Sequence, residues 1–180
     1  EKNTKEKILE EALKLFAQSG YMGTSMNDIA SKLGVTKAAL YKHYKSKQEI
    51  LDSIIEKMNE LDIERVKLYE MPEGDLEKVT AEYKETAFDK IKQFTKVQFL
   101  HWTEEEFSCC FRKMLTLEQY REPQMAQLYQ NYLASGPLTY MEALFSGMLG
   151  DEGKARQTAL DFYGPIFLLY SIYDGAEDKS

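Results

Sequence analysis

The nineteen residues from Leu33 to Leu51, LGVTKAALYKHYKSKQEIL, gather side chains that can bind phosphate. They include four lysines, two tyrosines and one of the two histidines of a chain whose formal net charge is −7. Ammonium, imidazole and phenol groups donate hydrogen bonds to phosphate oxygens, and the small Ala38 and Ala39 would let a helix enter the major groove of DNA. We interpret the segment as a DNA-binding element. The alternative is a basic, aromatic surface helix without a nucleic-acid partner.

The charge of the chain is divided unevenly along its length. Residues 1–47 hold nine Lys and Arg residues against five Asp and Glu residues, whereas residues 48–180 hold fourteen against twenty-five. Such an asymmetry indicates a basic head that binds a partner and an acidic body with another role. We therefore predict two domains, 1–47 and 48–180. Apolar residues recur every three or four positions almost throughout, so both domains are expected to be all-α.

Two short helices are predicted ahead of the basic segment. Asn3 can cap a first helix that ends at Gly20. Thr24 or Ser25 can cap a second helix that ends at Gly34.

The basic segment itself is predicted to form a third helix. Thr36 can cap it, and it should run from Lys37 to about residue 43, with Leu40 and the preceding Val35 pointing into the core of the head. Ser46 and Glu49 form a capping box for a long fourth helix that reaches about residue 69. A helix, a short turn with glycine and a second helix make a helix-turn-helix, whose second helix enters the major groove.

Several side chains of the head are expected at the DNA. Hydroxyl, ammonium and imidazole groups would bind phosphates, and a slim leading end of the third helix would approach the bases. The candidate DNA-binding residues are Thr24, Ser25, Thr36, Lys37, Ala38, Tyr41, His43, Tyr44 and Lys47.

The stretch TSMNDIASKLGVTKAALYKHYKSKQEIL, residues 24–51, closely resembles the DNA-binding segment of TetR-family transcriptional regulators. The matching positions are Ile29-Ala30, Gly34-Val35, Leu40-Tyr41, His43-Tyr44, Lys47 and Leu51. The upstream ILEEALKLFAQSGYMGTS is similar to the family's first helix and loop, so the resemblance covers about residues 5–55. Asn27 departs from the pattern because many relatives carry a basic residue there, and we do not count it as a DNA contact.

The resemblance implies a TetR-like architecture and function. Residues 1–47 would be the DNA-binding domain and residues 48–180 a helical ligand-binding and dimerisation domain, joined by the long fourth helix. The expected partners are a double-stranded DNA operator, a small-molecule effector and a second copy of the chain, and no cofactor is implied. We expect a dimeric repressor that an apolar or aromatic effector releases from a palindromic operator. The alternatives are a ligand-dependent activator and a protein that acts through a protein partner.

The body is predicted to contain four further helices, whose N-caps or first residues are Asp75, Thr103, Pro123 and Asp151. The fifth is expected to continue to about Val97. Gly136-Pro137 should kink or divide the seventh.

An unusual load of aromatic side chains in the body suits a cavity for an apolar or aromatic molecule. The candidate ligand-binding residues are Phe94, Trp102, Phe107, Phe111, Met114, Tyr129, Tyr132 and Tyr163. The alternative for each of them is an ordinary place in the core or in a dimer interface.

The last predicted helix contains FYGPIFLLYSIYD, residues 162–174, which is apolar on nearly all sides, and we assign much of it to subunit packing. TetR-like regulators pair through two C-terminal helices of each subunit. The chain stops soon after the first plausible one, so we expect a further helix to be missing from this sequence. The absence of an initiator Met likewise indicates a processed or trimmed chain.

Other classes of protein are disfavoured. The sequence has no glycine-rich phosphate loop and no nucleophile elbow, so we predict that the protein is not an enzyme. Adjacent Cys109 and Cys110 lack a nearby histidine, so no metal site is expected; a thiol or metal sensor is the alternative. No apolar run approaches the ~18 residues that a membrane span needs, and no secretory signal pattern is present, so the cytoplasm is the expected compartment.

Overall fold

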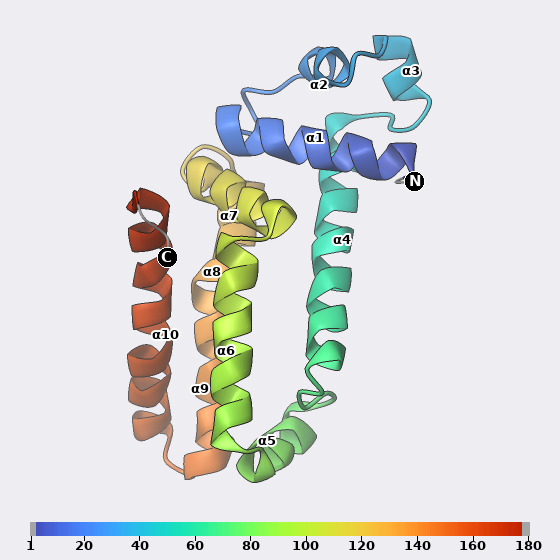
Figure 1. Ribbon diagram of the computed structural model, residues 1–180. Coiled ribbons are helices and arrows are strands. Elements are labelled where there is room, and N and C mark those ends of the chain that lie inside the picture. The colour runs from blue at the N-terminus through green and yellow to red at the C-terminus, as the bar shows by residue number, and fades with distance from the viewer. Residues whose placement is uncertain (1–2, 178–180) are drawn as a thin grey trace. The chain divides into compact units, whose positions relative to one another are not determined.

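The computed structural model describes residues 3–177, and helices account for its regular structure in this range (Figure 1). In chain order they are α1 (Thr4–Ser19), α2 (Met26–Leu33), α3 (Lys37–Tyr41), α4 (Lys47–Leu68), α5 (Leu76–Glu85), α6 (Phe88–Thr103), α7 (Glu106–Glu118), α8 (Pro123–Leu133), α9 (Ser135–Leu149) and α10 (Glu152–Gly175). The described residues contain no strand. The all-α prediction is confirmed.

The helices form two compact units. Unit 1 consists of the residues up to Glu64 together with Glu106–Gln127, and unit 2 consists of Arg65–Glu105 and the residues from Leu128 onward. The predicted boundary at residue 47 separates two expected functions, whereas the two units are defined by packing. The predicted boundary therefore stays a prediction. The structure adds that α7 and the start of α8 belong to the same unit as the head.

Local capping explains where the helices of the head begin. The Asn3 side chain accepts a hydrogen bond from the Lys5 N–H at 3.2 Å at the start of α1. Ser25 and Asp28 form a capping box at the start of α2, and Gly34 ends that helix in the left-handed conformation with φ 67°. These predicted boundaries are confirmed.

Unit 1 has a closed apolar core. The predicted face of α1 is buried, including Leu13 and Phe16, and α7 packs on α1 (Figure 1). Leu40 of α3 is 1% exposed, as predicted. Val35 was expected in the same core, but this prediction is wrong because its side chain is 43% exposed. The Val35 N–H donates to Ala30 O in the turn after α2, and the side chain points to solvent there.

Unit 2 is built on α6, α9 and α10, with α10 beside both α9 and α6 (Figure 1). α9 and α10 run antiparallel, and α5 packs against α9. The buried Tyr163 hydroxyl of α10 donates to Leu133 O at 2.6 Å, and the rings of Phe99 and Tyr170 stack at 5.5 Å. These contacts order the core of the unit.

Two predicted helix boundaries in the body are wrong. The fifth helix was expected to continue to about Val97, but it breaks at Thr86 and Ala87, where the backbone is extended and the Thr86 hydroxyl donates to Glu82 O. Thr103 was expected to cap the sixth helix. It is instead the last residue of α6, and its hydroxyl donates to Phe99 O one turn back.

Two other expectations in the body hold. The division near Gly136-Pro137 is confirmed, since α8 ends at Leu133 and α9 begins at Ser135 with Pro137 in its first turn. Asp151 caps α10 through the Lys154 N–H at 3.0 Å. Among the described residues, none of the helices has the length and apolar character needed to cross a bilayer.

Candidate DNA-binding site

The helix α3 presents its leading end to solvent. Thr36 caps it by accepting a hydrogen bond from the Ala39 N–H at 3.1 Å, and the buried Leu40 anchors the helix from the inside. Lys37 and Ala38 are exposed, and Tyr41 is 41% exposed. The result is a slim helix end with one cation, a methyl group and a phenol on its outer side.

Lys37 and Tyr41 are arranged as a pair. The Lys37 Nζ lies 5.8 Å from the centre of the Tyr41 ring, within the range of a cation–π contact. This contact orders two flexible side chains on the surface. Such an arrangement suits binding to a polyanion, because a pre-ordered cation loses less entropy on binding.

Ser25 lies at the start of α2 and is exposed. Its N–H and hydroxyl both donate to Asp28 Oδ2, at 2.7 and 2.6 Å. The hydrogen bonds from the Ser25 hydroxyl and backbone hold the pKa of the Asp28 carboxyl below its usual value. The carboxylate of Asp28 thus uses both donors, and the predicted contact of Ser25 with phosphate stays a prediction.

Thr24 and Tyr44 lie inside the head instead of on its surface. Thr24 is 3% exposed, and its hydroxyl donates to Gly20 O at 2.8 Å. Tyr44 is 4% exposed, burial raises the pKa of its phenol, and Lys5 Nζ lies 5.6 Å from its ring centre. Their predicted contacts with phosphate stay predictions, and the structure gives both residues a structural role.

Lys47 ties the turn between α1 and α2 to the start of α4. Its Nζ donates to Tyr21 O at 2.6 Å and to Thr24 O at 2.8 Å, and it lies 4.3 Å from the centre of the Tyr21 ring. Burial lowers the pKa of Lys47, an effect that the carboxylate of Glu118 opposes. Two of the three ammonium protons are used inside the head, which leaves one for a phosphate.

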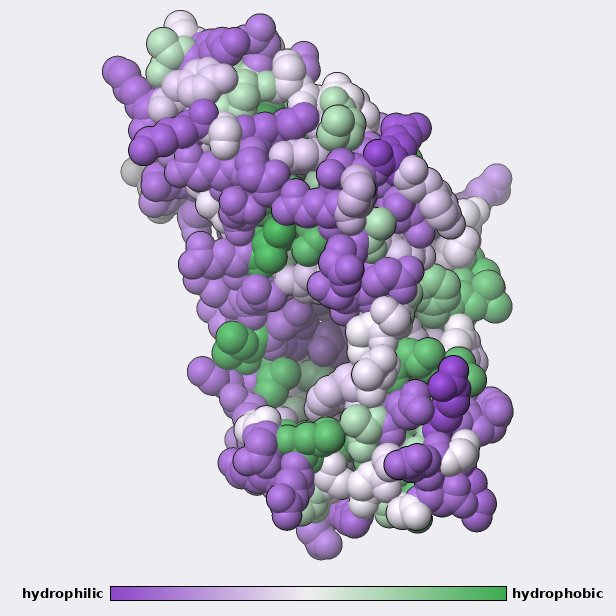
Figure 2. Space-filling model, turned by 180° about the vertical axis from the view of Figure 1, so that it is seen from behind, coloured by the Kyte–Doolittle hydropathy of each residue, from purple (hydrophilic) through white to green (hydrophobic). Residues whose placement is uncertain are grey.

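The remaining basic groups of the segment are at the surface. His43 is half-buried, whereas two lysines of the segment that were not among the predicted contacts are exposed: Lys42 and Lys45. Hydrophilic groups predominate over the head in the view of Figure 2. The positive charge of the stretch alone would have been enough to name these lysines as candidate DNA contacts. The prediction did not include them because it followed the family pattern.

The predicted ligand-binding residues are divided between the two units. Phe107, Phe111 and Met114 belong to unit 1, where Phe111 and Met114 are 0% exposed, as expected for core residues. The others belong to unit 2. There Trp102 contacts the Tyr132 ring at 6.3 Å between centroids, and Phe94 contacts Tyr69 at 6.0 Å.

Two hollows of unit 2 are lined by residues other than the predicted ligand-binding residues. One, of about 830 Å³, lies between α5 and α9, and its lining includes Leu76, Thr80, Ala143 and Gly147. The other, of about 560 Å³, lies at the break between α5 and α6. The predicted effector site therefore stays a prediction.

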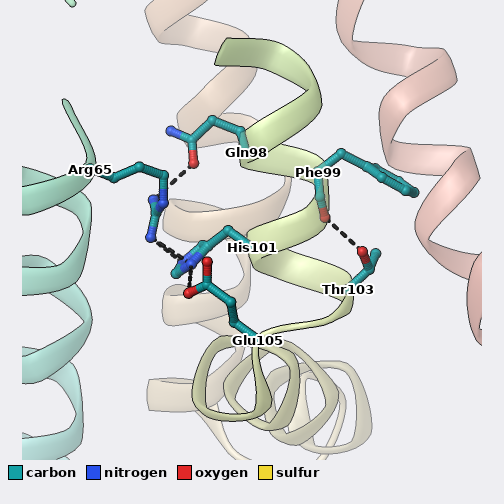
Figure 3. A network of polar contacts seen from close by, with 6 residues as sticks. All are labelled: Arg65, Gln98, Phe99, His101, Thr103 and Glu105. Atoms are coloured by element: carbon teal, nitrogen blue, oxygen red, sulfur yellow. Dashed lines mark hydrogen bonds and ion pairs between the residues drawn. The ribbon is translucent and has the colours of Figure 1, made fainter. Parts of the chain in front are cut away.

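A buried polar cluster in unit 2 was missed by sequence reasoning (Figure 3). His101 is 0% exposed, and its Nδ1 lies 2.7 Å from Glu105 Oε2. Arg65 Nη2 lies 2.6 Å from both ring nitrogens of His101, and Arg65 Nη1 donates to Gln98 Oε1 at 2.8 Å. The cluster joins the last turn of α4 to α6, and only tertiary packing brings Arg65 and His101 together.

Metal and thiol chemistry find no support in the described range. No group of three or more His, Cys, Asp or Glu side chains there could hold a metal ion. Cys109 and Cys110 are free thiols, and burial raises the pKa of Cys110, which disfavours a reactive thiolate.

The exposed α3, the turn before it and the capped α2 define a helix-turn-helix DNA-binding domain. Comparison with known proteins identifies its family: residues 8–54 match the family described as bacterial regulatory proteins, tetR family. The chain is 42% identical over 52 residues to the biofilm operon icaADBC negative transcriptional regulator IcaR of Staphylococcus epidermidis, covering 29% of this chain and 28% of that protein. The chain therefore matches less than a third of the length of this curated relative.

Solved structures extend the likeness of fold to the body. A TetR-family transcriptional regulator from Marinobacter aquaeolei VT8 superposes with a TM-score of 0.64 and 18% identity, covering 98% of this chain and 82% of that one. AibR in complex with isovaleryl coenzyme A and operator DNA superposes with a TM-score of 0.65 and 20% identity, covering 98% and 92%. Residues 8–54 are therefore a TetR-family DNA-binding domain, and the chain has the fold of that family. The family and these relatives are transcriptional regulators and not enzymes.

Proposed function

We propose that the protein is a ligand-responsive transcriptional regulator that binds a palindromic DNA operator as a homodimer. The observation that carries this proposal is the exposed end of α3, where Lys37, Ala38 and Tyr41 project from a helix anchored by buried Leu40. Two such helices in a two-fold dimer would enter successive major grooves about 34–36 Å apart. A protein that acts on DNA in this way would work in the cytoplasm.

The apolar surface of α10 supports the homodimer. Six large apolar side chains of this helix are at least 37% exposed: Leu160, Phe162, Phe167, Leu168, Leu169 and Ile172. Figure 2 shows hydrophobic groups along the edge where α10 lies. Large exposed apolar patches mark interaction sites in soluble proteins, and a second copy of α9 and α10 would cover this one.

A small apolar or aromatic effector is the proposed signal. Trp102, Tyr132 and Tyr163 bring three amphipathic rings into unit 2, and such rings combine apolar surface with hydrogen-bonding tips. AibR, which has the same fold, binds isovaleryl coenzyme A together with operator DNA. The effector would favour one arrangement of the body helices and so alter operator binding.

Repression is the proposed sign of regulation. IcaR, which is 42% identical to this chain over 52 residues, is a negative transcriptional regulator. A dimer without effector would bind the operator and block transcription. The effector would change the separation of the two heads, and the dimer would leave the operator because both heads can no longer bind at once.

Selection from a random duplex library tests the proposal. The wild-type chain should enrich a palindromic sequence, and its affinity should fall steeply with salt while its sequence preference persists. Enrichment of no sequence would overturn the operator-binding function and favour a protein partner.

A further inference from the structure

The buried carboxylate of Glu118 is unexplained by the fold and by the proposed function. Glu118 is the last residue of α7, its side chain is 0% exposed, and neither carboxylate oxygen has a hydrogen-bond partner among residues 3–177. Its ion-pair partner is the exposed guanidinium of Arg121, whose Nη1 lies 3.6 Å from Oε1. Buried carboxylates are normally hydrogen-bonded, and an acidic side chain at a helix C-terminus opposes the helix dipole. Stability of α7 therefore does not account for an acid at this position.

The carboxylate lies directly against Gly20, where the turn between α1 and α2 begins. A Cβ built on Gly20 would overlap Glu118 Oε1, and Gly20 has a φ of +81°, which favours glycine. Gly20 O in turn accepts the Thr24 hydroxyl at 2.8 Å. The fit of Glu118 against Gly20 thus connects α7 to the turn that leads into α2.

Lys47 holds the same turn through Tyr21 O and Thr24 O. Its ammonium group is partly buried, and the carboxylate of Glu118 attracts it electrostatically. Burial lowers the pKa of Lys47, and the Glu118 carboxylate opposes that lowering. The Glu118 carboxylate from α7 and the Lys47 ammonium from α4 therefore both contact the turn formed by residues 20–24.

We propose that Glu118 is a positioning residue for DNA binding. Its carboxylate keeps the 20–24 turn and Lys47 in the arrangement that presents Ser25 and α3 to the operator. The inference rests on the proposed function and deepens it, because it names the contact through which α7 is coupled to the head. Displacement of α7 would withdraw the carboxylate from Gly20 and loosen the start of α2.

The substitution Glu118→Gln tests this role because it keeps the side-chain shape and removes the charge. Operator affinity is measured with the duplex that the wild-type chain selects, together with the Tm and amide hydrogen exchange of residues 20–25. We expect affinity to fall about 5- to 20-fold, in the lower part of the usual range for coupling between sites. The Tm should stay the same or rise, because a buried charge without hydrogen-bond partners is replaced by a neutral group. Exchange of the turn amides should become faster.

Two further variants complete the experiment. Glu60→Gln removes the same charge from an exposed position of α4 in the same unit, and its affinity and exchange should match wild type. Gly20→Ala should also accelerate hydrogen exchange of the turn amides, because the new Cβ would overlap the Glu118 carboxylate and push it away from the turn.

Three outcomes would overturn the inference: Glu118→Gln with the affinity of Glu60→Gln, a loss of affinity matched by a proportional loss of Tm, or unchanged exchange in the turn. If the wild-type chain selects no DNA, the operator-binding function fails. The exchange data then decide alone whether Glu118 positions the turn.

Discussion

Unit 1 and unit 2 differ in how completely one chain buries their apolar side chains. The twelve largest fully buried side chains of the described range all lie in unit 1, among them Phe16, Leu40 and Phe111. In unit 2 the fully buried side chains of the described range are smaller or polar, such as Ala155, Ala159 and His101, and α10 leaves Leu168 60% and Ile172 55% exposed. Unit 1 thus completes its apolar core within one chain, whereas unit 2 leaves large apolar side chains of α10 exposed, in accord with the proposed pairing surface.

This contrast accords with the proposed roles of the two units. A DNA-binding head must hold a few side chains in fixed positions, and a closed core with capped helices achieves this. A body that pairs with a second copy and responds to an effector needs surfaces that are satisfied only in the complex. The following variants test the contrast.

The largest effect is expected for Leu40→Asp, which places a charge in the core of unit 1 where the side chain is 1% exposed. The free energy of unfolding of this unit should fall by at least about 4 kcal/mol, enough to unfold it. Circular dichroism should show lost helix. The single tryptophan, Trp102, lies in unit 2, so its fluorescence should stay that of a buried ring.

Val35→Asp is the matched control, because Val35 precedes the same helix but is 43% exposed. It should remain folded. Exposure of Trp102 in Leu40→Asp would show that the two units do not fold separately and would break the contrast.

The double variant Leu168→Glu and Ile172→Glu tests the surface of α10. Charges on a face that pairs with a second copy should weaken dimerisation by about tenfold or more, while leaving monomer helicity intact. Analytical ultracentrifugation measures the change. Arg156→Glu alters charge at an exposed site of the same helix and should leave the dimer unchanged. A wild-type monomer at all concentrations would refute the pairing surface.

Lys37→Ala and Lys47→Ala should separate contact with DNA from support of the head. Lys37 has no partner in the head besides the Tyr41 ring, so its loss should weaken operator binding about fivefold, reduce the salt slope by about one and leave the Tm unchanged. Lys47 holds two backbone carbonyls, so its loss should lower affinity and Tm together. Lys113→Ala, an exposed change on α7, serves as control. An unchanged Tm in Lys47→Ala would assign Lys47 to phosphate contact alone.

The smallest effect is expected for Tyr163→Phe in unit 2, which removes the 2.6 Å hydrogen bond to Leu133 O. The free energy of unfolding at pH 7 should fall by about 1–2 kcal/mol. Burial raises the pKa of Tyr163, so its contribution is complete below pH ~10, where the unfolded phenol is protonated, and is lost as pH rises towards the folded pKa. Urea unfolding of both proteins at pH 7 and 11 should show the difference shrinking at alkaline pH. A constant difference would contradict this assignment.

Local signals explain most of what could be predicted. Ser25 with Asp28, Thr36 and Asp151 cap their helices as expected, because a cap involves groups within three residues of each other. The break at Thr86 was missed because no glycine or proline marks it. Thr103 was misplaced because an intrahelical hydrogen bond to Phe99 O competes with capping, and the sequence pattern alone does not distinguish the two.

The residues of the candidate DNA-binding site also divide into those whose position could be predicted from local sequence and those whose position could not. Lys37, Ala38 and Tyr41 follow from helical spacing around Leu40, and the structure places all three outside. Thr24, Tyr44 and Lys47 have the right chemistry for phosphate, but tertiary contacts occupy them wholly or in part.

The sequence by itself determined the all-helical fold, the helix-turn-helix and the capped helices of the head, because each depends on residues close together in the chain. Tertiary structure alone decided that Glu118 lies against Gly20, that Arg65 meets His101 and that α10 leaves its apolar face exposed. These depend on residues distant in sequence, whose burial and pairing are set by packing that no local pattern encodes.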